Sequence, residues 1–148
     1  MTAKVPAIGL RPARDGDLPA LRSLLSQLGY DLPCDEIRRR LAAIGMAPDH
    51  AVFVGESDGR IVALLHLFVR PALEKPLEAV VQALVVDSGC RQGGVGRAMM
   101  MAAERWAQAR NLRSVSLSSH VAREDAHAFY EALGYVHVAT SRLLRKRL

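Results

Sequence analysis

The sequence predicts a mixed α/β protein, in which helices flank one mostly antiparallel sheet. Three observations support this prediction. Leucines recur at helical spacing near the start, an Asp-Gly pair separates two strand-like runs in the middle, and strands alternate with helices afterwards. The predicted order is βααβββαβαβ, with one or two strands at the end.

Length and composition limit the class of protein. The 148 residues predict one domain over 1–148, and 50% hydrophobic with 24% charged residues is typical of a packed core. No apolar run approaches the ~20 residues of a membrane span, and no secretory signal precedes the domain, so we expect a cytoplasmic protein without a membrane partner. Cys34 and Cys90 have no metal-binding spacing and are expected to be free thiols without a metal.

The first segment, Ala7 to Pro12, has an extended pattern. Asp15 or Asp17 then caps a helix that begins near Pro19 and ends at Gly29. The apolar stripe of this amphipathic helix consists of Leu18, Leu21, Leu24, Leu25 and Leu28.

A second helix follows Pro33 and ends at Gly45, with acidic residues in its first turn. The period then changes to that of strands. Ala51 to Glu56 and Arg60 to Arg70 are strand-like runs, and Ser57-Asp58-Gly59 between them predicts an antiparallel hairpin.

The rest of the chain alternates strands with helices. The predicted elements are a strand over Leu77 to Val86, a helix from Gly94 through Arg110, a strand over Arg113 to Ser119, a helix over Glu124 to Leu133 before Gly134, and one or two strands over Tyr135 to Leu144. The stripe predicted for the long helix is Val95, Ala98, Ala102, Trp106 and Ala109.

The net charge of +5 is compatible with nucleic acid, an acidic lipid surface or a phosphorylated small ligand. Its distribution disfavours nucleic acid, because no aromatic residues lie between the basic clusters as a single-strand binding platform requires. These clusters are Arg38 to Arg40, Arg91 with Arg97, and Arg142 with Arg145 to Arg147.

The most informative segment runs from Leu84 to Arg97, where glycines and two arginines separate a strand from a long helix. Glycines let a ligand approach the main chain, and free N–H groups at a helix start favour an anion, so we expect a phosphate site. The segment lacks the Lys-Ser/Thr of a P-loop and the register of a dinucleotide fingerprint. The alternative is a connection that uses glycine only for turning.

The run Arg91-Gln92-Gly93-Gly94-Val95-Gly96 resembles the signature of the GNAT superfamily of N-acetyltransferases, and Val85 and Val86 match its preceding aliphatic pair. The segment from Asp125 to Tyr135, with its Phe-Tyr pair and Leu-Gly-Tyr end, is similar to a later helix of that family. Leu10 to Ala13 resembles its opening, so the resemblance covers nearly the whole chain.

The resemblance implies a GNAT-like fold and an enzyme that transfers acetyl from acetyl-CoA to a primary amine. Main chain near Val86 would bind the pantetheine arm between parting strands, and amides from Gln92 to Gly96 would bind the pyrophosphate. Arg123 replaces a common family asparagine, which leaves that contact with the coenzyme open. The implied cofactor-binding residues are Val85, Val86, Arg91, Gln92, Gly93, Gly94, Val95, Gly96, Arg97 and Arg123.

The resemblance also implies that Tyr130 protonates the leaving thiolate, the alternative being a core tyrosine. Gln82 occupies the position where many relatives carry a glutamate as base. The period of two puts Glu78 and Gln82 on one face with Val86, but Glu78 lies roughly 26 Å from Val86, at ~3.3 Å per residue. His120 is therefore the candidate base, the alternative being a loop histidine without a role.

The leading hypothesis is acetyl transfer to a small-molecule amine, as in the aminoalkylphosphonate or aminoglycoside branches of the family. A non-catalytic coenzyme A-binding module, regulatory or acting on nucleic acid through Arg142 to Arg147, is the alternative. A homodimer is a further expectation. No motif identifies the acceptor.

Overall fold

The computed structural model describes residues 7–91 and 93–148, which divide into two compact units, one up to Ser118 and one from Ser119. The second unit contains one helix, α4 (Glu124–Ala132). The elements of the first are β1 (Gly9–Pro12), η1 (Asp15–Asp17), α1 (Leu18–Leu28), α2 (Cys34–Met46), β2 (His50–Ser57), β3 (Arg60–Arg70), β4 (Glu78–Val86), η2 (Ser88–Cys90), α3 (Val95–Gln108) and β5 (Val115–Leu117).

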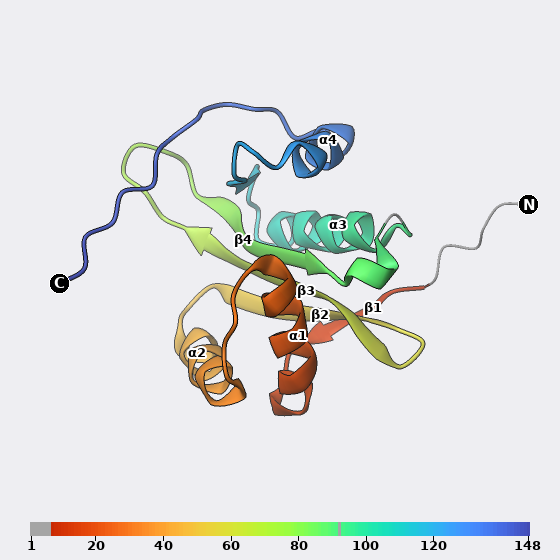
Figure 1. The fold of residues 1–148 in the computed structure, drawn as a ribbon. Coiled ribbons are helices and arrows are strands. Elements are labelled where there is room, and N and C mark those ends of the chain that lie inside the picture. The colour runs from red at the N-terminus through yellow and green to blue at the C-terminus, as the bar shows by residue number, and fades with distance from the viewer. Residues whose placement is uncertain (1–6, 92) are drawn as a thin grey trace, which may run out of the picture. The chain divides into compact units, whose positions relative to one another are not determined.

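The first unit is built on a five-stranded sheet in the order β1-β2-β3-β4-β5. All neighbouring strands are antiparallel except β4 and β5, which are parallel. In Figure 1, α1 and α2 lie on one face of this sheet and α3 lies on the other. The predicted fold class, a mixed and mostly antiparallel sheet flanked by helices, is confirmed.

The face toward α1 and α2 is held by the leucine stripe of α1. Leu18, Leu21 and Leu24 are each 2% exposed, and burial of such side chains contributes about 1.5–3 kcal/mol apiece. The buried residues of this cluster are Leu18, Leu21, Leu24, Ile37, Val54, Leu64 and Val85.

The opposite face packs against α3 through Met99 and Met100, which are fully buried. The helix approaches the sheet so closely that a Cβ atom on Gly55 would lie 2.9 Å from the Met99 sulfur. Gly55 therefore leaves room for that methionine.

The predicted stripe of α3 is partly wrong. Val95 and Trp106 are buried as expected, but Ala109 is exposed and Ala98 is only half-buried. Methionines fill the space against the sheet that an alanine methyl group cannot reach. The buried side chains are Val95, Met99, Met100, Ala103, Trp106 and Ala107.

The predicted strands over Tyr135 to Leu144 are also wrong, because residues 135–148 form neither helix nor strand. The segment has a strand-like pattern, but Val136 and Val138 are 80% and 91% exposed. A strand requires a hydrogen-bonded neighbour, which alternation along a sequence cannot provide.

A bulge divides β4 into two halves. His66 pairs with Ala83 while Leu67 pairs with Val81, so Gln82 is the extra residue between them. Because paired residues share a face, Glu78 opposite Arg70 lies on the α1 face, whereas Val86 opposite Ala63 lies on the α3 face. The expectation that Glu78 and Val86 share a face is therefore wrong.

Candidate active site

The site begins where β4 and β5 part. β5 pairs only with Ala79–Val81, so no strand described in the structure lies beside the rest of β4 on that side. The Asp87 N–H donates to the Val62 carbonyl oxygen at 2.8 Å. By antiparallel alternation, the main-chain groups of Leu84 and Val86 then point away from β3, toward the side of β5.

The turn after β4 is fixed to α1 by one side chain. Gln27 Nε2 donates to Asp87 Oδ1 at 2.8 Å, and its Oε1 accepts the N–H of Ser88 at 2.9 Å. The Cys90 N–H donates to the Asp87 carbonyl oxygen at 2.8 Å. The approach to α3 is thus held in place before any ligand binds.

α3 begins at a glycine in the left-handed region, since Gly94 has φ of 85°. No side chain caps this helix, and its first internal bond runs from the Ala98 N–H to the Gly94 carbonyl oxygen. The N–H groups of residues 95–97 therefore have no acceptor within the helix and face its positive dipole end. An anion is the natural partner of such groups.

Two exposed arginines flank the turn. Arg91 Nε lies 3.5 Å from the Val86 carbonyl oxygen, and Arg97 lies in the first turn of α3. Gln92 lies outside the described residues. Gly93 and Gly96 complete the segment, while Val85 is a core residue and contributes through its main chain alone.

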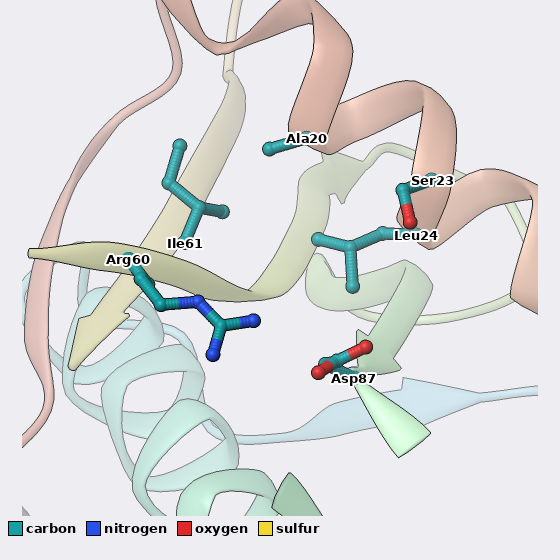
Figure 2. A pocket seen from close by; sticks show the side chains of 6 residues that line it. All are labelled: Ala20, Ser23, Leu24, Arg60, Ile61 and Asp87. Carbon is teal, nitrogen blue, oxygen red and sulfur yellow. The ribbon is translucent and has the colours of Figure 1, made fainter. Parts of the chain in front are cut away.

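A pocket of about 260 Å³ adjoins the other side of this turn. Figure 2 shows Ala20, Ser23 and Leu24 of α1 across from Arg60 and Asp87. Asp87 is the one lining residue that belongs to the segment 84–97. The pocket is therefore distinct from the open N–H groups of α3.

In the second unit, Tyr130 is half-buried on α4. Its ring has edge contacts with Phe129 at 5.0 Å and Tyr135 at 5.9 Å between ring centroids. Burial raises the pKa of the Tyr130 hydroxyl, and the nearby Arg123 charge opposes this shift. The hydroxyl therefore keeps its proton at neutral pH and has no hydrogen-bond partner in the part of the chain that the structure describes.

His120 is exposed before α4, and both ends of the residue are engaged. Its Nδ1 lies 3.1 Å from the Ala122 N–H, which donates to it, and its carbonyl oxygen lies 2.9 Å from His127 Nε2. The neutral ring then carries its proton on Nε2. Proton uptake at Nδ1 requires the bond to Ala122 to break.

Neither residue of β4 considered as a base is free to act as one. Gln82 is exposed at the bulge and has no carboxylate. Glu78 is ion-paired with Arg70 and accepts hydrogen bonds from Ser114 at 3.1 Å and Ser116 at 3.0 Å. Its carboxylate is committed to holding β3, β4 and β5 together.

The structure gathers the predicted cofactor residues of the first unit along one continuous segment, and Tyr130, His120 and Arg123 in the second unit. Sequence reasoning missed Gln27, because a bond across 60 positions leaves no local signal. It also missed the hydroxyl of Ser119, which is buried without a partner among the described residues. Its place next to His120 was the only available signal.

Comparisons with known proteins agree with this geometry. Residues 18–135 match the acetyltransferase (GNAT) family. The uncharacterised N-acetyltransferase YhdJ of Bacillus subtilis (strain 168) is 31% identical over 83% of this chain and 86% of its own length. The aminoglycoside N(6')-acetyltransferase type 1 of Klebsiella aerogenes is 29% identical over 94% of this chain and 96% of its own.

Among solved structures, the aminoglycoside N-acetyltransferase AAC(6')-Iy in complex with coenzyme A superposes with a TM-score of 0.85. It is 20% identical over 100% of both chains, which establishes a shared fold. The chain belongs to the acetyltransferase (GNAT) family. The predicted enzyme class, an acetyl-CoA-dependent N-acetyltransferase, is confirmed.

No group of three or more metal-binding side chains occurs among residues 7–91 and 93–148. Within the same residues, no helix has the length and apolar character needed to cross a bilayer.

Proposed function

We propose that this enzyme acetylates a primary amine of a small molecule, with the thioester arm between β4 and β5 and the pyrophosphate at the start of α3. The observation that carries the proposal is the parting of the two strands directly before Gly94. There the main-chain groups of Leu84 and Val86 face the gap, and the N–H groups of residues 95–97 are available to an anion.

In the proposed reaction the neutral amine attacks the thioester carbonyl carbon, and a carbon–nitrogen bond forms. Collapse of the tetrahedral intermediate breaks the carbon–sulfur bond, and the sulfur takes the Tyr130 hydroxyl proton, which solvent replaces. The burial that keeps Tyr130 protonated supports its role as general acid. The excess proton of the acceptor ammonium leaves to His120 or to water.

The bond from Ala122 to His120 favours water as the first acceptor of that proton, because the Nδ1 lone pair is already in use. The buried hydroxyl of Ser119 is a candidate for holding such a water molecule. Arg123 and the arginines at the turn are proposed to add positive charge near the phosphates.

The acceptor class rests on relatives whose names specify aminoglycosides, which are small-molecule amines. We further propose a cytoplasmic homodimer. The free thiols of Cys34 and Cys90 support a reducing compartment.

The test is a panel of amines with acetyl-CoA, in which release of the free thiol is measured and the acetylated product is identified by mass spectrometry. The panel contains an aminoglycoside, an aminoalkylphosphonate and a polyamine. We expect amine-dependent thiol release for at least one of them, lost in Gly94→Val. If acetyl-CoA binds in calorimetry while no amine raises thiol release, the non-catalytic alternative is correct.

A further inference from the structure

The C-terminal tail, residues 135–148, leaves five apolar side chains in solvent. It contains four basic residues and no acidic one. Single exposed apolar residues are ordinary, but a concentration of this kind usually indicates a missing partner. The five side chains, each at least 80% exposed, are Val136, Val138, Leu143, Leu144 and Leu148.

The composition of the tail is that of a strand. Tyr135, Val136 and Val138 are strong strand formers, and apolar residues alternate with polar ones about His137. Disordered segments are poor in such residues, because they cannot bury enough apolar surface. What the tail lacks is the edge of a sheet with which to pair.

The first unit offers such an edge at β5. This strand ends the sheet, and no strand in the described part of the chain pairs with its outer side. Val115 and Leu117 pair with Ala79 and Val81, so their side chains lie on the α3 face. A strand beside β5 with its valines on that face would continue the apolar surface, and an unpaired edge is a template for such addition.

We propose that the tail of one chain adds as a strand to the β5 edge of a second copy, and that the second copy's tail does the same in return. A reciprocal exchange covers both tails and both edges at once and closes on itself, whereas one-way addition would continue into a fibre. The proposal rests on the proposed homodimer and is independent of acetyl transfer.

Sedimentation velocity measures the first consequence. The wild-type chain is expected to be a dimer, and Val136→Asp/Val138→Asp is expected to weaken the dimer by about 100-fold or more, equivalent to about 2.7 kcal/mol. Thr140→Asp/Ser141→Asp is the matched control, which adds the same charges to the tail and should remain dimeric. Circular dichroism checks that all three are folded. A monomeric wild type, or a dimer unaffected by charges at 136 and 138, would overturn the proposal.

Crosslinking distinguishes exchange from a tail that folds back on its own sheet. In a Cys34→Ser/Cys90→Ser background, one chain carries Val138→Cys and a differently tagged chain carries Ser118→Cys, directly after β5. A bifunctional thiol reagent should join the two tags. In a chain with both cysteines it should give covalent dimers, and an intrachain link in a monomer would refute exchange. An inactive enzyme would leave both readouts unchanged.

Discussion

The protonation state of Tyr130 decides what this residue can do. Its pKa is raised above the usual 10, so the hydroxyl stays protonated across the range in which amines are acetylated. We predict that Tyr130→Phe lowers kcat by about 10²-fold and leaves the affinity for acetyl-CoA unchanged, because the proton is needed only as the thiolate leaves. Steady-state kinetics together with calorimetry make this measurement.

Tyr30→Phe is the control, since Tyr30 is 59% exposed and lies in the other unit. It removes a hydroxyl without touching α4 and should leave kcat unaltered. A kcat for Tyr130→Phe within about twofold of wild type, with chemistry rate-limiting, would make Tyr130 a packing residue.

His120 presents a more demanding case, because its Nδ1 already accepts a hydrogen bond from Ala122. If the ring opens that bond to take the substrate proton, His120→Ala should lower the rate most near neutral pH and remove an ionisation from the acid limb of the pH profile. His137→Ala, which loses only a contact with Thr140, is the control. An unchanged profile in His120→Ala would assign proton removal to water.

At the scale of elements, the turn into α3 depends on one backbone angle. At φ of 85°, Gly94 occupies a region that a β-branched residue avoids, and the displaced amides would no longer converge on a phosphate. We predict that Gly94→Val loses acetyl-CoA binding by calorimetry while remaining folded. Gly59→Val places the same strain, at φ of 76°, in the β2–β3 hairpin and should bind normally. Full affinity in folded Gly94→Val would remove the phosphate from this turn.

Sequence predicted best where the signal is local. The bounds of α1, the β2–β3 hairpin and the phosphate turn follow from leucine spacing, Asp58-Gly59 and the glycine run. Three features escaped because their causes are distant in the sequence. They are the bulge at Gln82, the commitment of Glu78 to Arg70 and two serines, and the lack of a sheet neighbour for the tail.

At the scale of the whole molecule, a buried carboxylate ties the start of the chain to the sheet. Asp17 is 4% exposed and accepts two hydrogen bonds from Arg11, at 2.8 and 2.7 Å, and one from the Arg14 N–H. Arg11 also donates to Glu56 of β2 at 2.7 Å. Removing one partner of a buried pair costs about 3–5 kcal/mol, so we predict a loss of about 3 kcal/mol for Asp17→Asn, measured by urea unfolding.

The pH dependence of that loss has a definite sign. The bonds from Arg11 hold the pKa of Asp17 below its usual value, so its contribution is present above about pH 4 and is lost as the pH falls through the lowered pKa. Burial lowers the pKa of His66 to about 4, which removes further stability as the pH falls from about 6.5 to 4. Asp17→Asn should flatten only the more acidic part of this curve. A stability difference from wild type that persists unchanged at pH 2 would contradict the assignment.

The bulge in β4 lets a single strand serve two compartments out of step with each other. Before Gln82 the even-numbered residues face α1, and after it the odd-numbered ones do, so this strand reads as a continuous apolar run interrupted by one glutamine. The count of residues between Glu78 and Val86 is therefore fixed. Deleting Gln82 would turn either Val85 out of the α1 core or Val81 away from α3. Length can change in the hairpin at 57–59 without such a reversal, which makes β4 the reading frame of the fold.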